Sequence, residues 1–137
     1  CVDVGHGQLD WKIASDARVC VHDRVNIRTM EPTLIGERVD LIVIDVSFIS
    51  LRLVLPVLPP LAVSGAPVIA LVKPQFEVGR EQIGKGGVVR DPDVRRSAVE
   101  KIRAWAGDHG FVAGPEVESP ITGPAGNIEY LLLLRTA

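Results

Sequence analysis

The sequence predicts an α/β fold built on a mostly parallel sheet, with an antiparallel hairpin at its C-terminal end. Two strand-length runs, residues 40–46 and 67–72, are rich in Val, Ile and Leu, as expected of strands buried on both faces. Segments with helical spacing separate such runs, a pattern typical of a parallel sheet covered by helices on both faces. The last two apolar runs follow each other with no helix between them, so we expect them to pair antiparallel.

The N-terminal third predicts short elements. Residues 1–4 (CVDV) indicate a strand that leads into a Gly-His-Gly turn, and residues 8–15 have the apolar spacing of a helix. A second short strand is expected at residues 18–22 (RVCVH). Residues 26–36 predict a loop or a poor helix, since Pro32 interrupts them.

The middle of the chain predicts strand, helix, strand and loop in turn. Residues 40–46 form the first strand, and residues 50–61 have helical spacing that Pro59 and Pro60 end. Residues 67–72 form the second strand, which Pro74 stops. Residues 75–90 hold many glycine and charged residues and few apolar ones, which indicates a long, exposed and flexible loop.

The C-terminal third predicts a long helix followed by two strands. Asp91 can act as the N-cap, Pro92 fits the first helical position, and Gly110 lies just past the end. The apolar face of this helix is expected at Val94, Ala98, Ile102 and Trp105. The strands are expected at residues 111–118 and 128–135.

Composition narrows the class of protein. A chain of 137 residues is one ordinary domain by length, and 47% hydrophobic residues suffice for a core. The net charge of −2, with mixed signs along the chain, argues against a dedicated nucleic-acid-binding module. Two cysteines are too few for a disulfide framework or a four-cysteine zinc site, and the three histidines have no metal-ligand spacing. We therefore expect no metal, no membrane span and a cytoplasmic location.

Three apolar runs each carry one ionisable residue that a buried strand does not tolerate. These are Asp45 in VDLIVIDVSF, Lys73 in PVIALVKPQF and Glu129 in GNIEYLLLLR. A lone charge in such a run is costly unless it is paired or lies where the strand leaves the core. In open α/β sheets, ligands bind at the carboxyl ends of parallel strands. An acid, an amine and a second acid at such ends predict a functional site.

Each of these residues also has an ordinary structural explanation. Asp45 would cap the following helix, Lys73 would extend its ammonium group past the rim of the sheet to water, and Glu129 would lie on an exposed strand face. The structural explanation is weakest for Lys73, because a partly desolvated lysine beside carboxylates is suited to proton transfer. A functional role for Glu129 is indicated only by its occurrence together with Asp45 and Lys73.

Two glycine-containing segments admit more than one interpretation. Asp3 at a strand end followed by Gly-His-Gly resembles a nucleotide-binding loop only weakly, because the third glycine is lacking, and the alternative is a turn in which Asp3 caps the following helix. It would also be the only support for a dinucleotide-dependent oxidoreductase. The segment around Arg80, Lys85 and Arg90 either contacts RNA phosphates or is an ordinary surface loop.

At these residues the sequence resembles the methyltransferase domain of the TlyA family, also called hemolysin A, a branch of the FtsJ-like ribose 2′-O-methyltransferases. The matching stretches are VDVGHGQLDWK, VDLIVIDVSFISL, ALVKPQFEVGREQIGKGGVVRD and SPITGPAGNIEYLL, and they cover almost the whole chain. The resemblance implies a Rossmann-like fold that uses S-adenosylmethionine. It also implies methylation of cytidine 2′-hydroxyls in ribosomal RNA, with ribosomal subunits as partners.

The resemblance also assigns residues. Of a Lys-Asp-Lys-Glu catalytic tetrad, the last three members match Asp45, Lys73 and Glu129. Asp3 matches the acid at the cofactor's ribose, Asn26 falls near the adenine contacts, and the cofactor contacts are expected to include Asp45 and Val46.

The chain departs from the family pattern at its beginning. The first lysine of the tetrad, the first strand with its glycine loop, and an S4-like RNA-binding domain have no counterpart in these residues. We therefore expect a truncated domain that is inactive alone. A non-catalytic module and a membrane-lytic protein are the alternatives, and the lack of a suitable apolar segment disfavours the second.

Overall fold

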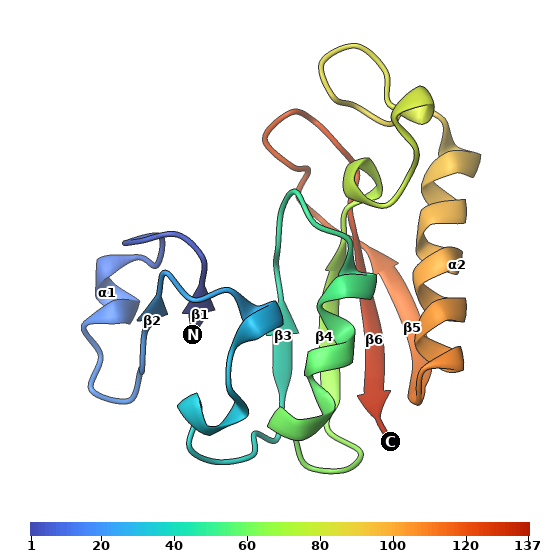
Figure 1. Ribbon diagram of the computed structural model, residues 1–137. Helices are drawn as coiled ribbons and strands as arrows, with labels where there is room; N and C mark the ends of the chain where they lie inside the picture. Colours follow the sequence, from blue (N-terminus) through green and yellow to red (C-terminus); the bar gives the residue numbers. More distant parts are fainter. The chain divides into compact units, whose positions relative to one another are not determined.

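The computed structural model describes residues 1–137 and divides them into two compact units, Cys1–Gly36 and Glu37–Ala137 (Figure 1). Each unit has its own sheet. The first sheet has two strands in the order β1-β2, and the second has four in the order β3-β4-β6-β5.

The smaller unit is made of short elements. Strand β1 (Val2–Asp3) pairs parallel with β2 (His22–Asp23), and α1 (Trp11–Ala14) is a single turn. Two 3-10 helices, Ile27–Thr29 and Pro32–Leu34, follow. The strand predicted at residues 1–4 and the helix predicted at residues 8–15 are thus present but shorter than expected, whereas the strand predicted at residues 18–22 lies instead at His22–Asp23 and shares only His22 with the prediction. No residue of this unit is fully buried, so no core extends them.

The larger unit contains a mixed sheet. Strand β3 (Ile42–Ile44) pairs parallel with β4 (Pro67–Val72), as the sequence indicated. Strand β6 (Tyr130–Thr136) lies between β4 and β5 (Phe111–Glu118) and is antiparallel to both. The predicted antiparallel pairing of the last two strands is confirmed. The sheet is mixed rather than mostly parallel, because β6 inserts beside β4.

Helix α2 (Pro92–Asp108) begins and ends as predicted. The Asp91 side chain accepts a hydrogen bond from the backbone N–H of Asp93, and Gly110 has a φ of +85°. A left-handed residue just past a helix end is where glycine is favoured. Ala98 and Ile102, on the predicted apolar face of α2, are fully buried.

The helix predicted for residues 50–61 is instead three consecutive 3-10 helices, Leu51–Leu53, Leu55–Val57 and Pro59–Leu61. Pro56 has no N–H to donate, and its ring excludes the carbonyl four residues earlier, so a continuous α-helix cannot pass through it. The apolar spacing was nevertheless correct, because the side chains that it picked out are buried: Leu51, Val54, Leu55 and Leu58.

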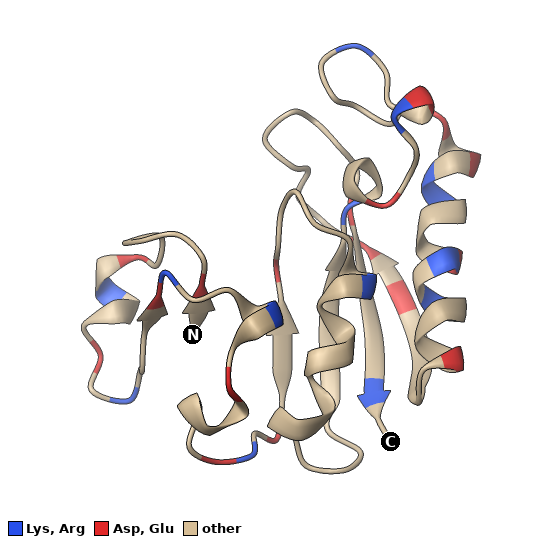
Figure 2. Cartoon of the chain, in the orientation of Figure 1, with Lys and Arg blue, Asp and Glu red and all other residues tan.

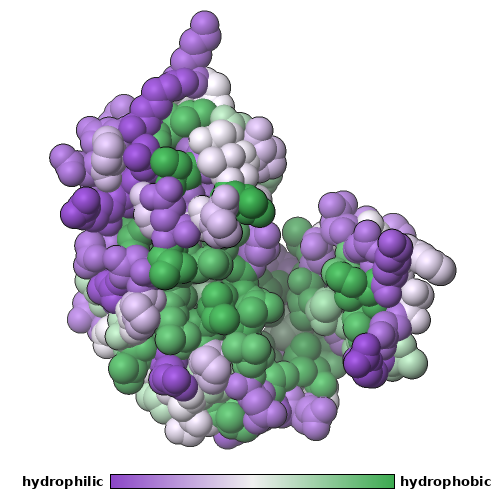
Figure 3. All heavy atoms as spheres, turned by 180° about the vertical axis from the view of Figure 1, so that it is seen from behind, coloured by the Kyte–Doolittle hydropathy of each residue, from purple (hydrophilic) through white to green (hydrophobic).

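The two faces of the larger sheet differ. Along β4, Val68, Ala70 and Val72 are fully buried, whereas Ile69 and Leu71 on the other face remain partly exposed. The pairing continues this second face across the sheet in two rows, Val43–Ile69–Leu133 and Leu71–Leu131–Val117. Seen from behind, hydrophobic atoms cover the middle of this unit (Figure 3). Coverage of both faces was therefore a wrong prediction for this sheet. Nowhere in the chain does a helix combine the length and the apolar character needed to cross a bilayer.

Candidate functional site

Asp45 and Lys73 meet at the carboxyl ends of the parallel strands β3 and β4. Lys73 Nζ lies 2.7 Å from Asp45 Oδ1 and donates a hydrogen bond to Ser47 Oγ at 3.0 Å. The side chain of Lys73 is 12% exposed and that of Asp45 is 72% exposed. The amine is thus largely withdrawn from water, yet the pair is reachable from solvent on its acidic side.

Glu129 lies beside this pair on the neighbouring strand. Val72 and Tyr130 are the last paired residues of β4 and β6, so Lys73 and Glu129 are the next residue on each strand. Glu129 is buried, and its Oε1 accepts a hydrogen bond from Gln75 Nε2 at 3.2 Å. It makes no ion pair with Lys73 within 4.0 Å. The structure therefore joins Asp45 directly to Lys73 and places Glu129 at the adjacent position across from Lys73, hydrogen-bonded to Gln75.

Gly123 makes room for the Glu129 carboxylate. A Cβ at this position would lie 2.7 Å from Glu129 Oε1, a distance that real side chains do not tolerate. The backbone N–H of Gly123 also donates to the carbonyl of Asn127. The SPITGPAGN segment therefore packs around the acid and needs glycine at this point.

The predicted exposed loop between β4 and α2 is only partly exposed. Glu77 and Val89 are buried within it. The buried side chain of Asn127 accepts from the N–H of Val89 at 2.9 Å and donates to the carbonyl of Gly87 at 2.9 Å. Asn127 thus holds the glycine-rich segment by both ends of its amide group.

The three basic residues proposed for RNA remain at the surface. Arg80, Lys85 and Arg90 are all exposed, and Figure 2 shows basic positions along the loop that precedes α2. Arg90 donates to the carbonyl of Lys85 at 3.1 Å, which closes the loop on itself.

Sequence reasoning did not identify Phe48 as special. Its backbone has a φ of +63°, in the left-handed region that disfavours a phenylalanine, and its side chain is 91% exposed. Its ring centroid lies 5.0 Å from that of Phe76. No sequence signal announces a left-handed phenylalanine, because such positions normally hold glycine or asparagine.

Glu77 was missed as well. Its buried carboxylate accepts from Ser50 Oγ at 2.6 Å and from the backbone N–H of Leu51 at 2.8 Å. Burial raises the pKa of Glu77, while the hydrogen bonds from Ser50 and Leu51 and the charge of Arg52 act in the opposite direction. In the sequence it looked like one more charge in a polar loop.

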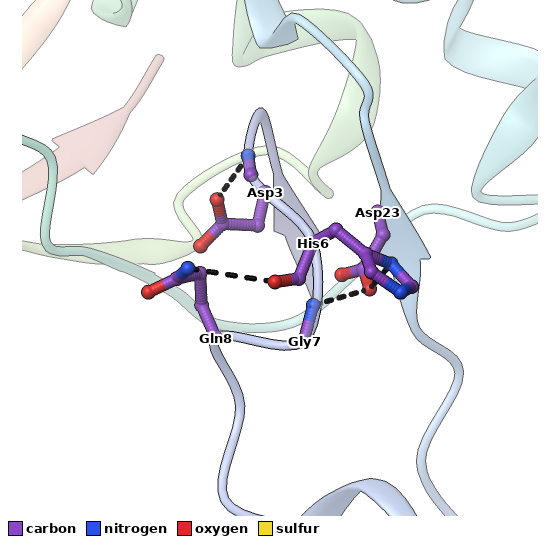
Figure 4. Close-up of polar contacts among 6 residues, drawn as sticks. Asp3, His6, Gly7, Gln8 and Asp23 are labelled. Carbon is purple, nitrogen blue, oxygen red and sulfur yellow. Dashed lines mark hydrogen bonds and ion pairs between the residues drawn. The ribbon is translucent and has the colours of Figure 1, made fainter.

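In the smaller unit, the Gly-His-Gly turn after β1 is held by two carboxylates (Figure 4). Asp3 Oδ1 accepts from the N–H of Gly5 at 2.7 Å. Asp23 Oδ2 accepts from the N–H of Gly7 and lies within ion-pair distance of His6 Nδ1, both at 2.9 Å. Helix α1 is capped by another residue, Asp10, so Asp3 stabilises the turn and not the helix.

The proposed cofactor contacts keep free polar atoms. Asp3 is exposed, and its Oδ2 has no hydrogen-bond partner. Asn26 is exposed and uses only its Oδ1, which accepts from the N–H of Arg28 at the start of a 3-10 helix. An acceptor for ribose hydroxyls and an amide donor for a base are the groups that a nucleoside requires, so these residues fit an adenosine cofactor. In the larger unit, Val46 is half-buried and directly follows Asp45.

No three or more His, Cys, Asp or Glu side chains are grouped so that they could hold a metal ion.

Comparison with known proteins finds matches over nearly the whole chain. The family model described as FtsJ-like methyltransferase matches residues 1–136. The chain is 50% identical over 134 residues to the 16S/23S rRNA (cytidine-2′-O)-methyltransferase TlyA of Mycobacterium tuberculosis, covering 98% of this chain and 50% of that protein. It is 48% identical to YqxC of Bacillus subtilis, a candidate rRNA methyltransferase, covering 97% and 48%. The chain thus spans about half the length of the curated relatives it matches.

Two solved structures complete the comparison. A candidate hemolysin from Streptococcus thermophilus superimposes with a TM-score of 0.93 at 46% identity, covering 99% of this chain and 50% of that one. An S-adenosylmethionine-dependent methyltransferase from Methanosarcina mazei gives a TM-score of 0.61 at 10% identity, covering 98% and 80%, a likeness of fold alone. The predicted resemblance is confirmed, and the chain belongs to the family of FtsJ-like methyltransferases.

Proposed function

We propose that this chain carries the methyl-transfer site of an enzyme that modifies the ribose 2′-hydroxyl of cytidines in ribosomal RNA, with S-adenosylmethionine as methyl donor. The observation that carries the proposal is the largely buried Lys73 side chain, whose amine is held between Asp45 Oδ1 and Ser47 Oγ where β3 and β4 end. Membership of the methyltransferase family supports the reaction class. The relative from Mycobacterium tuberculosis is named for this same reaction, which supports the substrate.

Lys73 would act on the hydroxyl that receives the methyl group. S-adenosylmethionine, when bound, supplies an electrophilic methyl group on its sulfonium. Transfer requires the 2′-oxygen to be aligned with that methyl group and its proton to be shared or removed. Lys73 Nζ would hold the 2′-hydroxyl and, as the neutral amine, accept its proton, which leaves an ammonium group beside the Asp45 carboxylate. Asp45 orients the amine directly, and Glu129 contributes a second negative charge from β6.

The smaller unit carries polar groups suited to an adenosine cofactor. Asp3 would offer its free carboxylate oxygen to ribose hydroxyls, and Asn26 would offer its amide to the adenine. In the larger unit, the family resemblance separately assigns cofactor contacts to Asp45 and Val46, which follow β3. The exposed positions of Asp3 and Asn26 support this assignment.

RNA would be recognised by stacking and by phosphate contacts. Phe48 is one residue from Ser47, whose hydroxyl contacts the Lys73 amine, and its ring is almost wholly exposed. Stacking of a base on an aromatic ring contributes about 1–3 kcal/mol and is tolerant of sequence. Arg80, Lys85 and Arg90 would contact phosphates, which position the RNA without reading its sequence. The 2′-hydroxyl itself is what distinguishes RNA from DNA here.

The test is methyl transfer by the whole protein with Lys73→Ala. We expect at least about a 100-fold loss of transfer of labelled methyl groups from S-adenosylmethionine to ribosomal RNA, the scale of a lost general base. Lys101→Ala, which removes an exposed lysine of α2, is the matched control and should keep full activity. Transfer by a folded Lys73→Ala protein at near-normal rate would rule out this role.

Two other readings have separate tests. A non-catalytic module would show no heat of binding with S-adenosylmethionine in calorimetry. A membrane-lytic protein would release haemoglobin from red cells. This alternative is suggested by the name Hemolysin A of a Brachyspira hyodysenteriae relative that is 35% identical over 131 residues. We expect binding in the first assay and no lysis in the second. With ribosomal RNA as the proposed substrate, we also propose a cytoplasmic location and ribosomal subunits as partners.

A further inference from the structure

Two loops at the carboxyl ends of β3 and β4 are fastened to each other at two separate places. At the first, Lys73 contacts Asp45 and Ser47. At the second, the carboxylate of Glu77 receives hydrogen bonds from Ser50 Oγ and from the N–H of Leu51. Each fastening joins residues about 26 positions apart in the chain, so neither results from local turn geometry.

Phe48 lies between the two fastenings in a strained conformation. A left-handed backbone costs a non-glycine residue about 1–2 kcal/mol, and such a residue persists only where the surroundings hold it. Its exposed ring is stabilised on one side alone, by Phe76 at 5.0 Å. The conformation of this segment must therefore be held by contacts at its two ends.

The second fastening carries a free-energy cost, because it buries the Glu77 carboxylate. A buried carboxylate is destabilised by loss of water unless a cation pairs with it. Glu77 has no ion-pair partner within 4.0 Å, and Arg52 influences it only at longer range. The apolar alternatives that would fill this space cannot accept the Leu51 N–H and the Ser50 hydroxyl together. A group that is costly to bury, and that joins the same two loops as the Lys73–Asp45 contact, points to a functional use.

We infer that Glu77 is a positioning residue, which holds the Asp45–Leu51 segment against the Lys73–Glu77 segment so that the Lys73 amine and the Phe48 ring stay in their working places. Glu77 touches neither Lys73 nor Asp45 directly, so it acts through the backbone of these two loops. This inference rests on the proposed function for the meaning of Lys73 and Phe48. The fastening itself does not depend on that function.

The experiment compares Glu77→Ala and Glu77→Gln in the whole protein. The glutamine side chain still accepts from the Leu51 N–H and can donate to Ser50 Oγ, so it should keep the loops in place. We expect Glu77→Ala to lower kcat by about tenfold or more, since small misplacements of reacting groups are costly, and Glu77→Gln to stay within about threefold of the parent. KM for S-adenosylmethionine should rise in Glu77→Ala, because Asp45 and Val46 lie in the segment that Glu77 holds, and should change little in Glu77→Gln.

A matched control separates positioning from general loss of stability. Thr136→Val removes a buried hydrogen bond, from Thr136 Oγ1 to the Val63 carbonyl at 2.9 Å, at the opposite end of β6. It should lower Tm without lowering kcat of the folded protein. Equal kcat values for Glu77→Ala and Thr136→Val, measured well below both Tm values, would overturn the inference.

A second readout does not require catalysis. Loss of the fastening should speed amide hydrogen exchange at Leu51 and chymotryptic cleavage after Phe48 in Glu77→Ala, and not in Glu77→Gln or Thr136→Val. Faster exchange with unchanged kcat would leave Glu77 a structural residue and reject positioning. If the parent protein transferred no methyl group to ribosomal RNA, the proposed function would fail. The fastening would then be judged by exchange and cleavage alone, and unchanged rates in Glu77→Ala would refute it.

Discussion

At the scale of single residues, the backbone and the side chain of Phe48 favour different amino acids at this position. The left-handed conformation favours glycine, whereas the proposed stacking role requires an aromatic ring. A strained residue at a site is an observation from which function can be inferred. Strain and exposure occur together here beside the Lys73 contact.

Substitution of Phe48 by Gly and by Ala separates these demands. Both variants lose the ring, so both should bind RNA at least about fivefold more weakly, the lower end of the stacking range. Only glycine relieves the backbone strain, so Phe48→Gly should be more stable than Phe48→Ala by about 1 kcal/mol. Urea denaturation and RNA binding measure the two effects. An alanine variant as stable as the glycine variant would argue against strain at this position.

Glu77 gives a pH prediction with a definite sign. Burial raises its pKa in the folded protein above the ordinary value of 4.5, with Arg52 and the two hydrogen bonds only reducing the shift. A group whose pKa is raised on folding contributes stability below its unfolded pKa, and that contribution is lost as the pH rises through the folded value. The parent should therefore gain stability relative to Glu77→Gln as the pH falls toward 4.5.

The measurement is the difference in unfolding free energy between the parent and Glu77→Gln across a series of pH values. Taking the difference cancels the titration of all other carboxyl groups, as long as the two proteins share the same contacts elsewhere. A difference that stays flat from pH 4 to pH 8 would show that folding does not perturb this carboxyl group.

At the scale of elements, the glycine-rich loop before α2 is held more firmly than its composition indicates. Asn127 supplies both an acceptor and a donor to its backbone, and Arg95 donates to the carbonyls of Val89 and Arg90. A loop held in this way presents its basic side chains in one arrangement, which lowers the entropy cost of binding a phosphate backbone.

Asn127→Ala should loosen this loop. The buried N–H of Val89 and the carbonyl of Gly87 would lose their partners, at about 1–3 kcal/mol for each buried group left unpaired. We expect a lower Tm and faster amide exchange at Val89. Asn127→Asp retains the acceptor but turns a buried, unpaired carboxylate oxygen toward the Gly87 carbonyl, so it should destabilise the loop at least as much. Unchanged exchange at Val89 in the alanine variant would contradict this role.

At the scale of the whole molecule, net charge bears on the RNA binding that the proposed function requires. A net charge of −2 provides no general attraction to a polyanion, so phosphate affinity must come from local basic residues. Each phosphate contact that is neutralised changes the slope of log K against log salt by about 0.7 for single-stranded nucleic acid.

Lys85→Ala should therefore reduce the magnitude of that slope by about 0.7 in the whole protein, with RNA binding weakened at low salt and little changed at high salt. Binding measured from 50 to 300 mM salt tests the prediction. Lys101→Ala, in the exposed face of α2, is the control and should leave the slope as it is. If Lys85→Ala and the parent protein showed the same slope of log K against log salt, Lys85 would not contact an RNA phosphate.

Local rules were sufficient for much of this protein. The apolar runs located β3, β4, β5 and β6, and the Asp91, Pro92 and Gly110 signals bounded α2, because burial and capping act over a few neighbouring residues. The charges misplaced in those runs were enough to pick out Asp45, Lys73 and Glu129. A charge in an apolar strand is anomalous whatever the fold.

Only the tertiary structure decided how these pieces are joined. In the tertiary structure β6 lies between β4 and β5, and residues 50–61 form 3-10 helices around Pro56. The Glu77 carboxylate accepts a hydrogen bond from Ser50 Oγ. Lys73 pairs with Asp45 rather than with Glu129. Strand order, left-handed strain and long-range hydrogen bonds depend on contacts between residues far apart in the chain. The spacing of neighbouring residues carries no record of those contacts.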